Sequence, residues 1–174
     1  WELISRSQEE GGFGFDPERI WVTAYESDPE AAEIWHRVAG IRKERIQFRD
    51  GKDNYWDMGV AGPGGPCSEL YYDRGPAFGG DDERPGDDTD RFMEFWNLVF
   101  MQYNQAADGS RTPLPNPSID TGAGLERILA VLQGTDSVWE TDALFPLIET
   151  AQSVTGATYT PGDYESRENF SLRV

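Results

Sequence analysis

The sequence predicts a domain of the α+β class, and three features of the 174-residue chain support this prediction. Hydrophobic residues make up 37% of the chain and aromatic residues 13%, so the chain can bury a core. Segments rich in β-branched and aromatic residues are interspersed with segments of helical periodicity. The longest apolar segment, residues 91–105, is apolar on both faces, which indicates a central strand of a sheet.

The first predicted strand is WVTAYE, residues 21–26, because it is rich in β-branched and aromatic residues. We expect a helix next, with Ser27 as its N-cap, Glu30 completing a capping box and Gly40 at its end. The expected buried face of this helix consists of Ile34, Trp35 and Val38. A second strand is expected at residues 45–49.

A long loop rich in glycine and proline is expected at residues 50–67, and its length indicates a binding role. A strand at residues 69–73 and a solvated acidic insert at residues 79–90 follow it. After the long apolar strand, Asp108 and Gly109 predict a turn.

The segment SIDTGAGLERI, residues 118–128, predicts the start of a helix that can meet a ligand. Gly122 and Gly124 allow close approach of the backbone, and the N-terminal end of a helix is positive. Arg127 points away from the apolar stripe of the helix, so packing does not require it. These features suit a ligand that carries phosphate. The stripe consists of Leu125, Ile128, Leu129 and Leu132.

The last predicted helix spans about residues 141–154, with Pro146 near its first turn. Residues 156–168 are polar and rich in turn formers, which predicts a boundary there.

Charge and composition argue against several kinds of function. The formal net charge of −17 disfavours non-specific binding to nucleic acid and to anionic membranes. One cysteine, Cys67, and one histidine, His36, exclude a disulfide framework and a zinc site built from Cys and His. The sequence lacks an apolar run of about 18 residues and does not open like a signal peptide. A cytoplasmic protein without a membrane partner is therefore expected.

Glu94 and Asn97 stand out as strongly polar residues of the long apolar strand. A spacing of three would place them on opposite faces of a regular strand, and burying either without a partner would be costly. In one interpretation, Glu94 pairs with an arginine and Asn97 bonds to backbone. In the other, a bulge turns both toward one site, where Glu94 helps to bind a metal–phosphate group. The residues alone leave both interpretations open.

Other candidates have an ordinary structural interpretation beside the functional one. Asp120 is either the N-cap of the following helix or a ligand-binding residue. Trp56, in the long loop, can be ordinary packing. Cys67 has no histidine partner nearby in the sequence, so we expect a packed residue and no nucleophile. We expect no role for His36.

Three long segments, in this order, resemble the catalytic domain of the alanyl-tRNA synthetases, a class II family. They are DNYWDMGVAGPGGPCSELYYDRG, FMEFWNLVFMQYNQ and PSIDTGAGLERILAVLQG. The resemblance covers nearly the whole chain. It implies an antiparallel sheet flanked by helices, which activates alanine with ATP and then charges tRNA(Ala).

The resemblance also implies roles for individual residues. GAGLERI is similar to the third class II motif, so Arg127 would bind ATP phosphate, with Gly124 beside it. Glu94 matches the acidic residue that holds Mg²⁺ with ATP. Asp120 would pair with the ammonium group of alanine. The positions that match the alanine pocket are Trp56, Asn97, Val99, Asp120 and Gly122.

The chain departs from the family pattern in three ways. Gly64 replaces a cysteine of the usual GPCGPC segment, which argues against a catalytic thiol. The first two class II motifs are absent, and with them the arginine expected on the α-phosphate. The editing domain with its zinc ligands is also absent, so no zinc is expected in this chain.

We therefore expect residues 1–155 to form the C-terminal part of the catalytic domain. Residues 156–174 would be a linker and the start of a tRNA-binding helical domain. The chain alone is expected to be inactive. The alternatives are a related enzyme that charges an acceptor other than tRNA, and an acidic binding module without catalysis.

Overall fold

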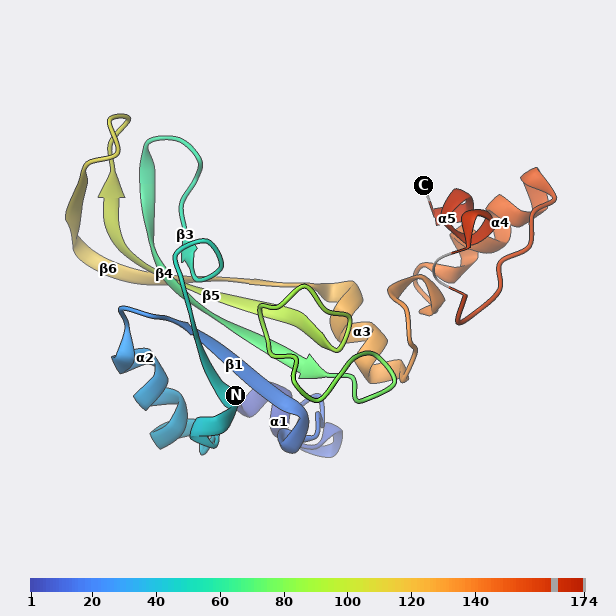
Figure 1. Ribbon diagram of the computed structural model, residues 1–174, viewed down its shortest axis with the longest axis horizontal. Helices are drawn as coiled ribbons and strands as arrows, with labels where there is room; N and C mark the ends of the chain where they lie inside the picture. Colours follow the sequence, from blue (N-terminus) through green and yellow to red (C-terminus); the bar gives the residue numbers. More distant parts are fainter. Residues whose placement is uncertain (164–165, 174) are drawn as a thin grey trace. The chain divides into compact units, whose positions relative to one another are not determined.

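The computed structural model describes residues 1–163 and 166–173. The chain divides into two compact units, Trp1–Ala123 and Gly124–Val174, and each is described by itself (Figure 1). The first unit contains a six-stranded sheet with the order β2-β1-β4-β5-β6, and β3 pairs with β4 beside this path. The predicted α+β class is confirmed.

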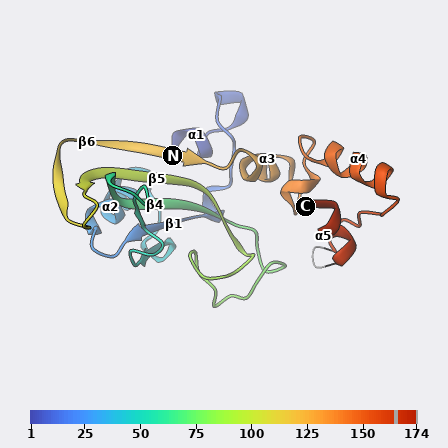
Figure 2. The same cartoon turned by 90° about the horizontal axis from the view of Figure 1, so that it is seen from above.

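The strands are β1 (Ile20–Tyr25), β2 (Ile46–Arg49), β3 (Tyr55–Trp56), β4 (Gly62–Asp73), β5 (Phe92–Gln105) and β6 (Arg111–Ala123). β1 and β2 are parallel, and every other pairing is antiparallel. β5 lies between β4 and β6 (Figure 1 and Figure 2), as expected for a strand that is apolar on both faces.

The α-helices are α1 (Glu2–Ser5), α2 (Pro29–Ile34), α3 (Leu125–Gln133), α4 (Phe145–Thr155) and α5 (Arg167–Arg173). Single turns of 3₁₀-helix are η1 (Gln8–Glu10), η2 (Pro17–Arg19), η4 (Lys43–Arg45) and η5 (Val138–Glu140), and η3 (Trp35–Ala39) is a π-helical turn.

The helix after β1 differs from its prediction at its start. Its N-cap is Asp28, and not Ser27, because the Asp28 carboxylate accepts a hydrogen bond from the Ala31 amide at 3.2 Å. Pro29 is the first residue of the helix, and its ring restricts its φ to a value suited to a helix. Gly40 ends the helical segment with a φ of 72°, as predicted.

The predicted buried face of this helix is only partly correct. Ile34 and Val38 are exposed, and Ala31 is the buried residue of α2. The π-helical turn that begins at Trp35 changes the helical period, so a stripe spaced for an α-helix turns outward there. Trp35 still faces the sheet, and its Nε1 donates a hydrogen bond to Ser68 Oγ at 2.8 Å.

Three segments form strands that the sequence did not predict, and the first of them is β3, which lies inside the loop expected at residues 50–67. Residues 62–67, expected to be loop, begin β4, and the prolines of residues 111–117 lie in the edge strand β6, where a missing amide is tolerated. At Gly65, an added Cβ would lie 1.9 Å from the Phe100 carbonyl oxygen, so the backbones of β4 and β5 approach more closely than a side chain allows. The predicted strand at residues 69–73 is the end of β4.

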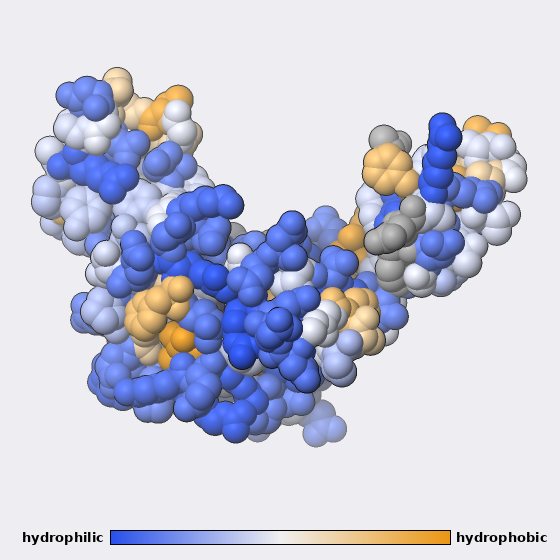
Figure 3. Space-filling view, in the orientation of Figure 1, coloured by the Kyte–Doolittle hydropathy of each residue, from blue (hydrophilic) through white to orange (hydrophobic). Residues whose placement is uncertain are grey.

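The insert at residues 79–90 is irregular, as predicted, and is held by arginines. Arg49 Nε donates to the Pro85 carbonyl at 2.7 Å, and Arg91 forms ion pairs with Asp73 and Asp81. Hydrophilic residues dominate the face of the molecule seen in Figure 3, in keeping with the net charge of −17.

The second unit has a small core around Ile148, Tyr159 and Leu172, which joins α4, α5 and the segment between them. Pro146 lies in the first turn of α4, as predicted. Of the predicted stripe on α3, Ile128 is buried, whereas Leu125 and Leu132 are exposed.

Candidate functional site

A β-bulge in β5 sets the direction of its polar side chains. Asn97 lies opposite Glu69 and Glu94 lies opposite Tyr71, which leaves Phe95 as an extra residue between them. Glu69 and Tyr71 are two residues apart on β4 and so share one face. Glu94 and Asn97 therefore share that face too, which confirms the bulge that the second interpretation required.

The neighbouring strand β6 adds two predicted residues to the same face. Gly122 lies opposite Asn97, and Asp120 lies opposite Val99. Directly opposed residues have Cβ atoms roughly 5 Å apart. The register therefore gathers four of the predicted alanine-pocket residues into one patch, which we call the β5–β6 patch: Asn97, Val99, Asp120 and Gly122.

The β5–β6 patch is open above Gly122. Apart from Gly122 and its two chain neighbours, no described residue has a heavy atom within 4 Å of a Cβ placed on Gly122. Asp120 is exposed and lies in β6, and its Oδ1 accepts a hydrogen bond from the Thr121 amide at 2.9 Å. The N-cap of α3 is Gly124, so the interpretation of Asp120 as a helix cap is wrong.

Glu69 is a buried acid of this face that the sequence analysis missed. The residue is 7% exposed, and its Oε2 accepts hydrogen bonds from Tyr71 Oη at 2.8 Å and Thr23 Oγ1 at 3.2 Å. Burial, together with the nearby carboxylate of Glu94, raises the pKa of Glu69 to about 7. One signal was present in the sequence: Glu69 alternates with Cys67 and Tyr71, which both favour burial.

The loop before β4 carries Trp56, which lies in β3 opposite Gly65 and is 38% exposed. The register of the sheet does not itself place Trp56 in the β5–β6 patch. At Gly64, where the family pattern has cysteine, an added Cβ would lie 2.7 Å from the Trp56 carbonyl oxygen. Gly64 thus permits β3 to lie close to β4.

Cys67 has the environment of a packed residue, as predicted. It is 2% exposed and packs with Val99 and Met101. Burial, and then the charge of Glu69, raises the pKa of its thiol to about 12, so the reactive thiolate is disfavoured near neutral pH.

In the second unit, Gly124 and Arg127 lie at the start of α3. A Cβ added to Gly124 would lie 3.2 Å from Arg127 Cδ and 3.4 Å from its Cβ. The missing side chain at Gly124 therefore leaves room for the Arg127 side chain beside the first turn of the helix.

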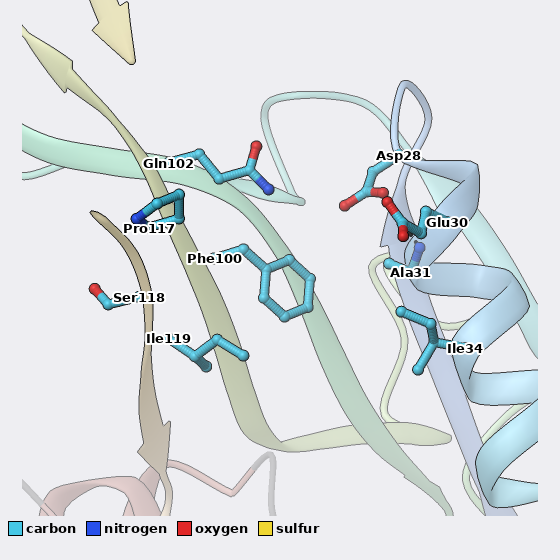
Figure 4. A pocket seen from close by; sticks show the side chains of 9 residues that line it. All are labelled: Asp28, Glu30, Ala31, Ile34, Phe100, Gln102, Pro117, Ser118 and Ile119. Atoms are coloured by element: carbon cyan, nitrogen blue, oxygen red, sulfur yellow. Dashed lines mark hydrogen bonds between the residues drawn. The ribbon is translucent and has the colours of Figure 1, made fainter. Parts of the chain in front are cut away.

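The opposite face of the sheet holds a cavity of about 400 Å³ between α2 and the end of β5 (Figure 4). Phe100 and Ile119 contribute to it and have the opposite orientation to Val99 and Asp120, so the cavity is separate from the β5–β6 patch. Its lining consists of Asp28, Glu30, Ala31, Ile34, Phe100, Gln102, Pro117, Ser118 and Ile119.

Residues 1–163 and 166–173 contain neither a ready-made metal site nor a membrane-spanning helix. No three His, Cys, Asp or Glu side chains in this part of the chain are arranged to hold a metal ion by themselves. No helix there is both long and apolar enough to cross a membrane.

The family model and the relatives that match this chain are all tRNA synthetases. The family model described as "tRNA synthetases class II (A)" matches residues 1–174. The chain is 64% identical to the alanine–tRNA ligase of Nocardia farcinica over 168 residues, which is 91% of this chain and 18% of the relative. It is 53% identical to the alanine–tRNA ligase of Saccharopolyspora erythraea, over 91% of the chain and 18% of the relative. It is also 51% identical to that of Thermobifida fusca, over 100% of the chain and 20% of the relative. The chain thus spans 18% to 20% of the length of these relatives.

Proposed function

This chain belongs to the class II tRNA synthetase family, and from that premise we propose that it supplies part of the active site of an alanine–tRNA ligase. In the proposed reaction, the carboxylate of alanine attacks the α-phosphorus of ATP, which yields alanyl-adenylate and pyrophosphate. A hydroxyl of the terminal ribose of tRNA(Ala) then attacks the alanyl carbonyl, which forms the ester and releases AMP. The side chains act by binding, orientation and charge stabilisation, so no protein nucleophile is needed.

The observation that carries this proposal is the β5–β6 patch, which offers the chemistry that alanine requires. Asp120 would pair with the ammonium group, and Asn97 would bind a polar group of the substrate. Val99 supplies apolar contact for the methyl group. Gly122 leaves the space in which the substrate would lie. Trp56 would close the pocket from β3.

Two residues are proposed to act on ATP, Arg127 in one unit and Glu94 in the other. Arg127 would bind phosphate, with Gly124 leaving room for its side chain. Glu94 would hold Mg²⁺ that arrives with ATP, and its carboxylate fits this role because it lies on the same face as the patch. Bound Mg²⁺ would neutralise charge on the phosphates.

The rest of the proposal concerns the longer protein. Residues 1–155 would complete a catalytic domain, and residues 156–174 would lead into a helical domain that binds tRNA. The net charge of −17 does not favour tRNA binding by this chain alone. The enzyme would work in the cytoplasm.

The test is ATP–pyrophosphate exchange by the protein from the full open reading frame, with each amino acid in turn. Alanine should support exchange, and the product should form ester-linked alanyl-tRNA(Ala). Activation of another amino acid, or transfer of alanine to an acceptor other than tRNA, would contradict the proposal. The 174-residue chain alone should give no exchange, because the α-phosphate arginine is expected elsewhere.

A further inference from the structure

A chain of hydrogen bonds joins Glu69 to the segment that carries Trp56. Thr23 Oγ1 donates to Glu69 Oε2 at 3.2 Å, and Asn54 Nδ2 donates to Thr23 Oγ1 at 2.9 Å. Thr23 and Asn54 are fully buried, and Glu69 is nearly so. Asn54 directly precedes β3, so this chain of bonds reaches from the main sheet to the start of the strand that carries Trp56.

Backbone pairing alone holds β3 weakly. β3 has two residues, and they lie opposite Gly65 and Pro66. Asn54 extends this short ladder: its carbonyl accepts a hydrogen bond from the Cys67 amide at 2.9 Å, and its Nδ2 also donates to the Cys67 carbonyl at 3.2 Å.

Packing does not explain why an acid lies at position 69. A buried carboxylate is costly without a cation, and no arginine or lysine in the described part of the chain forms an ion pair with Glu69. What the acid provides is an acceptor for two hydroxyl groups, those of Thr23 and Tyr71. It does so at a defined place, between Thr23 on β1 and Asn97 of the β5–β6 patch.

We propose that Glu69 is a positioning residue that, through Thr23 and Asn54, fixes the Trp56 segment relative to the β5–β6 patch and so sets the affinity for alanine. This inference rests on the proposed function. Glu69 itself need not touch the substrate, because its effect passes through the buried hydrogen bonds.

The first test uses Thr23→Val in the full-length enzyme, because valine keeps the shape of threonine and removes the hydroxyl group. The alanine KM should rise about tenfold, while kcat and the ATP KM stay within about twofold. Hydrogen–deuterium exchange at residues 50–57 should become faster, with β4 and β5 unchanged. Tyr71→Phe is the matched control, because it removes the other donor to Glu69 and leaves the Asn54 branch intact. Its alanine KM should stay within about twofold of the wild-type value.

Variants of Glu69 test the acceptor itself. Glu69→Gln keeps an accepting oxygen and should retain an alanine KM close to that of wild type. Glu69→Leu should behave like Thr23→Val, and the double variant should be no worse than either single one, because both break the same chain of bonds. If Glu69→Leu does not fold, Thr23→Val and Glu69→Gln decide the question.

Three results would overturn the inference. The first is a Thr23→Val variant whose alanine KM and hydrogen–deuterium exchange at residues 50–57 are both unchanged. The second is a Tyr71→Phe variant whose alanine KM rises as much as that of Thr23→Val. The third is an equal rise of the alanine KM in Glu69→Gln and Glu69→Leu. A wild-type enzyme without alanine-dependent exchange would instead contradict the proposed function. In that case, hydrogen–deuterium exchange at residues 50–57 would still test whether Thr23 anchors the segment.

Discussion

Replacing Gly122 by alanine should weaken alanine binding without weakening the fold. Gly122 does not have a positive φ, and an added Cβ meets no described heavy atom within 4 Å. A glycine-to-alanine change at such a position stabilises a protein by about 0.4–1 kcal/mol, because it restricts the unfolded chain. The local stability of β6 should therefore be unchanged or slightly higher.

The same methyl group would lie beside Asn97, in the space proposed for the substrate. Inserting a methyl group into a fitted site costs about 1–3 kcal/mol, which corresponds to an increase of roughly 5- to 150-fold in the alanine KM. The ATP KM should change little, because Gly122 belongs to the proposed alanine pocket alone.

Two measurements on the full-length enzyme separate these effects: alanine-dependent pyrophosphate exchange, and hydrogen–deuterium exchange at the amides of β5 and β6. Gly65→Ala is the matched control, because its Cβ would lie 1.9 Å from the Phe100 carbonyl oxygen and would force the strands apart. It should lose more than about 3 kcal/mol of local stability. If Gly122→Ala lowers the protection of β6, or leaves the alanine KM unchanged, the reasoning about open space above the patch is wrong.

Four further substitutions test the remaining residues. Arg127→Ala should raise the ATP KM or lower kcat in pyrophosphate exchange, a loss of about 2–4 kcal/mol in transition-state terms; unchanged kinetics with an intact fold would contradict its role. Asp120→Asn should raise the alanine KM with little loss of thermal stability, because the amide oxygen can still accept the Thr121 hydrogen bond; a loss of stability with unchanged kinetics would indicate a structural role. Gly64→Cys should displace Trp56, because its Cβ would lie 2.7 Å from the Trp56 carbonyl oxygen; faster hydrogen–deuterium exchange in β3 and a higher alanine KM are expected, and no change in either would refute the close approach. The pKa of Glu69 is raised from 4.5 to about 7, so burying this residue costs no folding free energy below pH 4.5 and an increasing amount between pH 4.5 and pH 7. Glu69→Gln should therefore gain up to about 3 kcal/mol of stability above pH 7 and none near pH 4. Denaturation at each pH measures this difference.

The sequence predicted those parts of the fold that local patterns determine. β1, β2, β5 and the end of β4 were foreseen because their residues favour strands whatever their neighbours are. Residues 62–67 and the strand β6 were not, since glycine and proline disfavour strands locally. Tertiary structure overrides that preference: Gly65 meets the Phe100 carbonyl closely, and the prolines lie at the edge of the sheet.

For the site too, local patterns predicted some features, whereas features that depend on distant residues were missed. The cost of burying Glu94 and Asn97 separately was enough to suggest a bulge, because that argument uses neighbouring residues alone. The role of Glu69 depends on Thr23, which is 46 residues away in the sequence, and no local pattern reveals such a partner. The placement of Trp56 likewise depends on a pairing between separate segments.

The bulge at Phe95 also bears on how this strand can change in evolution. Deletion of the extra residue Phe95 would leave Glu94 and Asn97 two residues apart, a spacing that keeps both side chains on one face of a regular strand. Deletion of Leu98 would instead make Asn97 and Val99 adjacent, so that one of the two would turn away from the patch. The length of β5 is therefore expected to vary more readily at the bulge than between the patch residues Asn97 and Val99.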